Sequence, residues 1–144
     1  MRLATLLSCA LALPLLAGSN NDGATSQIDN TGQHSLSLVR EQPYFWDKKI
    51  NFYLVVARMP VCMRRHLIGA MAPATKVEIW QVPSGAYIVR TARFMYATET
   101  ETCEGFARMD AEPPEGLGKQ IGTFVEKNGT PEFVPAEGEA RAGG

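Results

Sequence analysis

The run Cys62-Met-Arg-Arg-His66 holds the side chains with the most reactive chemistry in this 144-residue chain. Cysteine and histidine both bind zinc, and a spacing of four residues places two side chains on one face of a helix. A zinc site needs at least three protein ligands, and Cys103 is the other thiol outside the N-terminal apolar run. One hypothesis is therefore a small hydrolase or metal-dependent enzyme that uses His66 with these cysteines or with nearby carboxylates (Glu99, Glu101 and Glu104).

A second interpretation pairs the two cysteines with each other. Residues 1–19 are typical of a secretory signal peptide, with Arg2, an apolar run over 3–16 and small residues over 17–19. Disulfides persist in exported proteins. We therefore predict a Cys62–Cys103 disulfide in a periplasmic or secreted protein, and we assign no catalytic residue, metal or cofactor.

The N-terminal apolar run also bears on membrane attachment. A membrane-spanning helix needs about 20 apolar residues, so the run over 3–16 is too short for one. The stretch Leu6-Leu7-Ser8-Cys9 resembles a lipobox, but Leu7 fits that pattern poorly and the apolar run continues well past Cys9. We expect neither a transmembrane segment nor a lipid anchor at Cys9.

Basic and aromatic side chains suggest a different kind of site, a binding face. Arginine matches the geometry of carboxylate and phosphate groups, and arginine with aromatic residues dominates the energetics of protein interfaces. The candidate contacts are Arg64, Arg65, His66, Arg90, Arg93, Trp80 and Tyr87. The alternative is that Arg64 and Arg65 pair with the acidic residues near Cys103, which the disulfide would bring close.

The charges are unevenly distributed, although the net charge is only −1. Residues 40–93 hold nine basic and three acidic side chains, whereas residues 94–144 hold four basic and ten acidic ones. The two stretches neutralise each other if they meet in the fold, and otherwise they leave a dipolar surface that steers a charged partner. A nearly neutral chain is atypical of nucleic-acid binders, so we expect no nucleic-acid partner.

Most of the elements that must position these residues are predicted to be strands. The apolar run over 52–57 is typical of a buried strand. The stretches 76–82 and 86–96 flank the turn sequence Pro83-Ser84-Gly85 and predict a β-hairpin. Residues 98–108 predict a third strand, because Thr98, Thr100 and Thr102 alternate with Glu99, Glu101 and Cys103.

Two further segments have sequences that predict local structure, a hairpin near the C-terminus and one short helix. Asn128-Gly129 predicts a tight terminal hairpin between 120–126 and 131–134, in which Pro131 marks an edge strand or a non-strand. Residues 61–72 are compatible with one short helix that stops before Pro73.

The expected organisation is a signal peptide over 1–19, a flexible tether over 20–42, one β-rich domain over 43–134 and a disordered tail over 135–144. The fold class is mainly β, with α+β as the alternative. We expect a small antiparallel roll or partly open barrel with at most one short helix and one disulfide. The favoured function is an exported, non-enzymatic binding module of the bacterial cell envelope that recognises a protein partner through its basic and aromatic face.

Overall fold

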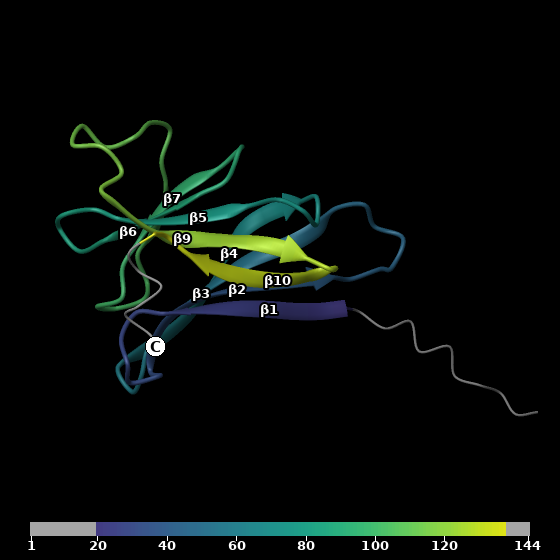
Figure 1. Cartoon of the computed structure of the whole chain (residues 1–144), viewed down its shortest axis with the longest axis horizontal. Coiled ribbons are helices and arrows are strands. Elements are labelled where there is room, and N and C mark those ends of the chain that lie inside the picture. Colours follow the sequence, from purple (N-terminus) through teal and green to yellow (C-terminus); the bar gives the residue numbers. More distant parts are fainter. Residues whose placement is uncertain (1–19, 138–144) are drawn as a thin grey trace, which may run out of the picture.

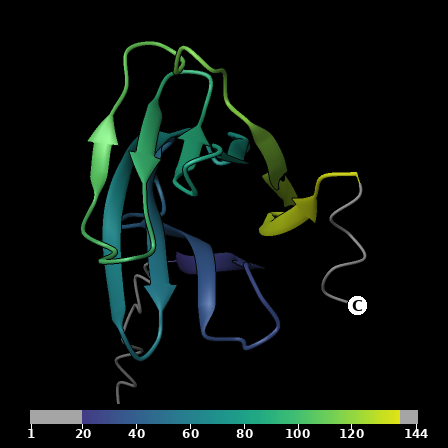
Figure 2. The ribbon, with the colours of Figure 1, turned by 90° about the vertical axis from the view of Figure 1, so that its left-hand side faces the viewer.

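The computed structural model describes residues 20–137, which fold into two antiparallel sheets (Figures 1 and 2). The four-stranded sheet has the order β1-β2-β3-β4, with β1 at Asn20–Gln27, β2 at His34–Gln42, β3 at Ile50–Arg58 and β4 at Cys62–Met71. The six-stranded sheet has the order β10-β9-β5-β6-β7-β8. Its strands are β5 (Val77–Gln81), β6 (Tyr87–Arg90), β7 (Met95–Thr98), β8 (Phe106–Arg108), β9 (Lys119–Lys127) and β10 (Thr130–Pro135).

The predicted mainly β class is confirmed. The described residues contain no helix, and the two sheets do not close into a barrel. The core lies between the sheets, because alternate side chains of each strand point to opposite faces. Phe52, Leu54 and Val56 of β3 are fully buried there against residues such as Val77 and Ile79 of β5.

Arg40 closes one side of the two-sheet core. β1 lies beside β10 there, and the Arg40 side chain connects the two sheets. Its guanidinium donates to Asp22 of β1 at 2.7 and 2.8 Å and to Glu126 of β9 at 2.6 Å. These two carboxylates raise the pKa of Arg40, so the buried guanidinium stays charged.

The prediction of a flexible tether over 20–42 is wrong, because the segment forms β1 and β2 along an eight-pair register. In β2, Leu36 and Leu38 alternate with more exposed residues and enter the core. β1 carries no such apolar alternation, since its inward side chains are small or polar, such as Ala24 and the buried Ser26. Pairing with β2 therefore places β1 in the sheet.

The prediction of a helix over 61–72 is also wrong, because Cys62–Met71 is β4 and pairs with β3 along its length. The predicted strand over 98–108 is interrupted by a loop over 99–105 that separates β7 from β8. The second arm of the predicted hairpin ends at Arg90 and turns into β7. For Cys62–Met71, pairing with β3 outweighs the local sequence pattern.

Two hairpin predictions are confirmed. β5 pairs with β6, and β9 pairs with β10 across a turn in which Asn128 and Gly129 have φ of 52° and 80°. Pro131 lies in β10, an edge strand, as expected for a residue without a backbone donor. The predicted signal peptide and all but the first three residues of the predicted tail (135–137) lie outside the described residues, and Pro135 ends β10.

Candidate functional site

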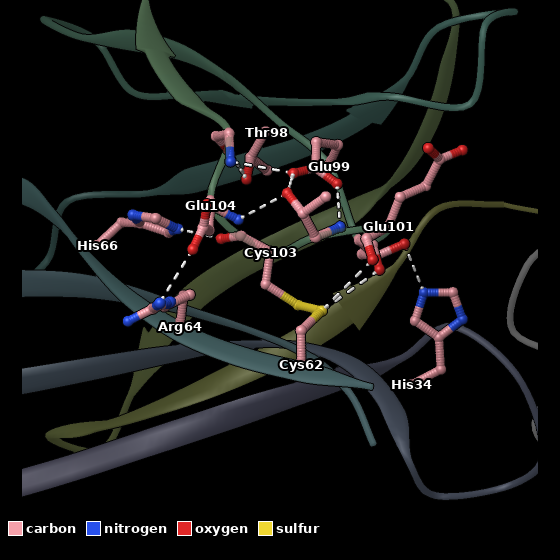
Figure 3. The surroundings of a disulfide bond; sticks show 12 residues. His34, Cys62, Arg64, His66, Thr98, Glu99, Glu101, Cys103 and Glu104 are labelled. Carbon is pink, nitrogen blue, oxygen red and sulfur yellow. Dashed lines mark hydrogen bonds and ion pairs between the residues drawn. A yellow bond between two sulfur atoms is a disulfide. The ribbon is translucent and has the colours of Figure 1, made fainter. Parts of the chain in front are cut away.

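The predicted disulfide joins β4 to the loop over 99–105 (Figure 3). Cys62 and Cys103 are bonded through sulfur, with their Cα atoms 5.8 Å apart. Cys103 is completely buried and has a φ of 61°, a conformation that is uncommon for a residue other than glycine. Both sulfurs are used in this bond, so the hypothetical set Cys62, His66 and Cys103 has no thiolate to offer a metal.

His66 is occupied by structural contacts. Its Nε2 donates to the carbonyl oxygen of Cys103 at 2.7 Å, and its ring stacks on Phe106 with ring centroids 4.6 Å apart. Phe106 in turn stacks on Tyr96, whose hydroxyl donates to the carbonyl oxygen of Ile68 on β4. His66 therefore helps to hold β4 against β7 and β8 on the side of the core opposite Arg40.

The carboxylates of the enzyme hypothesis do not converge on His66. Glu104 pairs with Arg64, and Glu99 accepts hydrogen bonds within its own loop. Across the described part of the chain, no group of three or more histidine, cysteine, aspartate or glutamate side chains is arranged to hold a metal ion. The local arrangement supports a structural rather than a catalytic role for His66.

Glu99 organises the loop that carries Cys103. Its carboxylate accepts hydrogen bonds from the hydroxyl and the backbone N–H of Thr102 and from the backbone N–H of Gly105. These donors stabilise the ionised form and lower the pKa of Glu99 to about 2, with the hydroxyl of Thr102 as the largest cause.

Acid should loosen this loop through Glu99. Because its pKa is lower in the folded than in the unfolded state, Glu99 contributes its full stabilisation above the unfolded pKa of about 4.3. That contribution is lost as the pH falls from there toward the folded pKa of about 2. NMR titration of the Glu99 carboxyl, with exchange of the Thr102 and Gly105 amide protons, measures both effects.

The matched comparison for this prediction uses two variants of the same loop. Glu99→Gln should accelerate amide exchange at Thr102 and Gly105 at neutral pH, whereas Glu101→Gln, whose side chain holds no backbone group of the loop, should not. A Glu99 carboxyl that titrates at its ordinary pKa would contradict the prediction.

Arg64 and Arg65 lie on opposite faces of β4, because neighbouring residues of a strand alternate. Arg64 points toward the loop over 99–105 and pairs with Glu104 at 3.0 Å, so the predicted pairing with acids near Cys103 is confirmed for this residue (Figure 3). Arg65 points to the outer face of the four-stranded sheet. There its guanidinium lies 3.7 Å from the ring centroid of Tyr53 and 2.6 Å from Glu41.

Around Arg65 the sheet presents an exposed apolar and aromatic surface. In the register of β3 with β4, Leu67 lies opposite Tyr53 and Arg65 lies opposite Val55. Met63 and Leu67 flank Arg65 on the same face and are 60% and 53% exposed. We call this surface the β3–β4 face; it consists of Tyr53, Val55, Met63, Arg65 and Leu67.

The remaining predicted contacts lie elsewhere. Tyr87 is buried in the core, where burial raises the pKa of its hydroxyl, so the prediction that it contacts a partner is wrong. Arg90 forms ion pairs with Glu78 at 2.6 Å and with Glu112 at 3.1 Å. Trp80 lies near Arg90 and packs on a small second core formed by Val82, Ile88 and Leu117.

Arg93 lies in the turn between β6 and β7, with its guanidinium 5.6 Å from the centre of the Phe94 ring. Of the seven predicted contacts, only Arg65 belongs to the β3–β4 face. Met63, Leu67 and Tyr53 were not predicted as contacts. The sequence predicts a short helix over 61–72 and a buried strand over 52–57, and neither prediction exposes these side chains on one sheet face. Alternation along β4 was the signal that would have placed Met63, Arg65 and Leu67 together.

The described residues include no helix that could cross a membrane. A scan against protein-family models found no match for this chain. Searches of curated proteins and of solved structures also found no match.

Proposed function

We propose that this protein is an exported, non-enzymatic binding module that recognises a protein partner in the bacterial cell envelope through the β3–β4 face. The observation that carries the proposal is the setting of Arg65. Its guanidinium is stacked on Tyr53 and held by Glu41, between the exposed side chains of Met63 and Leu67.

The composition of this face supports protein recognition. Tyrosine, arginine and methionine are enriched in protein interfaces, and tyrosine and arginine are frequent among the residues that contribute most to binding. Large apolar side chains that remain exposed side by side are a typical mark of an interaction surface.

The rigidity of the face supports the same proposal. All five side chains stand on two paired strands, and the Cys62–Cys103 disulfide fixes the first residue of β4. A surface that is already ordered loses less conformational entropy when a partner binds. Arg65 in particular needs little reorganisation, since Tyr53 and Glu41 already define its position.

Site-specific photo-crosslinking in the exporting cell tests this proposal. A photoreactive residue at Met63 or Leu67 should give a defined protein adduct, and the same residue at Arg64 should not. Arg64 is the matched control, because it adjoins these positions on β4 but lies on the opposite face.

A second variant pair tests the energetics. Arg65→Ala should lower the yield of the adduct by about fivefold or more, the usual effect of removing an arginine that anchors an interface. Arg64→Ala should leave the yield unchanged, and both variants should melt within a few degrees of the parent because their ion pairs are exposed. Equal adducts from the two faces, or an Arg65→Ala variant that binds normally, would overturn the proposal.

A further inference from the structure

The loop between β2 and β3 presents three consecutive aromatic side chains to solvent. Tyr44, Phe45 and Trp46 are 56%, 71% and 62% exposed. The rings contact one another: those of Tyr44 and Trp46 stack at 4.8 Å, and that of Phe45 meets Trp46 edge-on at 4.9 Å. Aromatic side chains usually bury most of their surface, so a cluster at the tip of a loop calls for an apolar surface to receive it.

The backbone of this loop is held in shape. The N–H of Asp47 donates to the carbonyl oxygen of Tyr44 at 3.1 Å. The side-chain amide of Gln42 donates to the carbonyl oxygens of Phe45 and Asp47 at 3.4 and 3.0 Å. The three rings are thus presented by an ordered turn.

Unpaired basic residues accompany the aromatic tip. Lys48 and Lys49 follow it directly. Lys76 lies in the segment after Met71, which pairs with Ile50 at the end of this loop, and Arg93 lies in the turn after Arg90, which pairs with Glu78 of β5. Within the described residues, no acidic side chain lies within ion-pair distance of any of these four cations. The loop over 43–49 itself holds one acid, Asp47, against the two lysines Lys48 and Lys49.

The chain also enters the fold at this end. Asn20, the first described residue, pairs with Gln42, which lies two residues before Tyr44. The first described residue of the domain therefore lies near the start of the aromatic loop, and the predicted signal peptide over 1–19 directly precedes it in the sequence. On the expected export route, this is the end of the molecule that the leader holds at the membrane.

We propose that the loop over 43–49 docks onto an anionic phospholipid bilayer, with Tyr44, Phe45 and Trp46 in the headgroup region. Tryptophan and tyrosine favour the membrane–water interface, and the four cations complement anionic lipid headgroups. A projecting tip of three rings suits a soft lipid surface better than a protein interface, which typically buries about 800 Å² on each partner. This proposal goes beyond the binding module, because it adds a membrane contact that does not involve the β3–β4 face.

Vesicle binding tests the inference on the exported protein, with its N-terminus established by intact mass. The probes are vesicles of pure phosphatidylcholine and vesicles that also contain about 30% phosphatidylglycerol, in low and in physiological salt. A Trp80→Phe background leaves Trp46 as the single tryptophan, because the chain has two. We expect co-sedimentation with the anionic vesicles and a blue shift of Trp46 fluorescence.

Three variants sharpen the test. In the parent background, Phe45→Ser with Trp46→Ser should lower the partition coefficient by on the order of tenfold or more, since it removes the apolar surface that enters the bilayer. Lys48→Gln and Lys49→Gln should each lower it about fivefold at low salt. The matched control is Met63→Ser with Leu67→Ser, which removes exposed apolar side chains from the β3–β4 face and should leave vesicle binding unchanged.

The outcomes separate this inference from the proposed function. A loop variant that binds vesicles as well as the parent, or equal binding to neutral and anionic vesicles, overturns the membrane proposal. Loss of the protein adduct in the Arg65→Ala variant, with vesicle binding intact, supports two separate surfaces. If the loop variant loses the protein adduct while the parent ignores vesicles, the loop contacts protein and the membrane proposal fails.

Discussion

Replacing Arg40 with methionine is expected to lower the free energy of unfolding by about 3–5 kcal/mol. The guanidinium is almost completely buried, with 4% of the residue exposed. Besides Asp22 and Glu126, it donates to the carbonyl oxygens of Pro73 and Gly129 at 2.9 and 3.1 Å. Methionine would leave two carboxylates without their cation and two carbonyl oxygens without these donors. Urea denaturation monitored by circular dichroism measures the loss.

Arg65→Met is the matched control, because it removes an arginine that also forms a 2.6 Å ion pair but lies on the surface. Exposed ion pairs contribute about 0–1 kcal/mol, so this variant should remain close to the parent. Equal losses of unfolding free energy in the two variants would contradict the prediction that burial makes the contribution of Arg40 to stability large.

A triple variant isolates the electrostatic part of the Arg40 effect. Combining Arg40→Met with Asp22→Asn and Glu126→Gln removes both uncompensated charges and should recover part of the lost stability. The pairing of β1 with β2 persists in every variant, since its backbone hydrogen bonds do not depend on these side chains. The loss should therefore concentrate where β1 meets β10, and hydrogen exchange of the β10 amides would report it.

Local sequence signals predicted the parts of the fold that depend on neighbouring residues. Asn128-Gly129 specifies its turn because both residues tolerate positive φ, and Pro83-Ser84-Gly85 marks the turn between β5 and β6. The disulfide was predictable from the two cysteines outside the apolar run, together with the expectation of export. These features need no knowledge of distant partners.

The sequence was less informative for segments whose secondary structure depends on residues far away in the chain. The inward side chains of β1 are Asp22, Ala24 and Ser26, and nothing about them indicates a strand until Arg40 and β2 are in place. The run over 61–72 suits either a helix or a strand locally, and pairing with β3 decides for the strand. Because β4 is a strand, Arg64 and Arg65 point to opposite faces of the sheet, although the predicted binding face included both.

The uneven charge distribution had a mixed outcome. Ion pairs between Arg40 and Glu126, Arg64 and Glu104, and Arg90 and Glu112 join the basic and acidic stretches, as expected if the two meet in the fold. Among the described residues, Lys48, Lys49, Lys76 and Arg93 have no acidic partner and lie in the segments that join β2 to β3, β4 to β5 and β6 to β7. The positions of the charged residues along the sequence do not indicate which cations will lack an ion-pair partner in the fold.

Breaking the Cys62–Cys103 disulfide should lower the free energy of unfolding by about 4 kcal/mol, from the loop-closure entropy of a bond between residues separated by 41 positions. That loss is a large fraction of the 5–15 kcal/mol typical of a domain. Denaturation of the parent with and without reductant, and of a Cys62→Ser, Cys103→Ser variant, measures it. The reduced parent and the variant should agree to within about 1 kcal/mol, and a loss below about 1 kcal/mol would contradict the prediction.

Hydrogen exchange can locate the stabilisation that the disulfide provides. If the bond acts by restricting the unfolded chain, its loss lowers the protection of the slowest amides everywhere, including β2 and β3, which lie far from loop 99–105 in sequence. If it acts by holding Cys103 at its unusual positive φ, only the amides of that loop lose protection and the core keeps its stability. We expect the first pattern, because the hydrogen bonds that the backbone N–H groups of Thr102 and Gly105 donate to Glu99 hold the loop even without the disulfide. Within the loop, the amide of Glu104 should lose additional protection. The β3–β4 face should then survive reduction in the folded fraction, since pairing with β3, which runs the length of β4, keeps Arg65 over Tyr53.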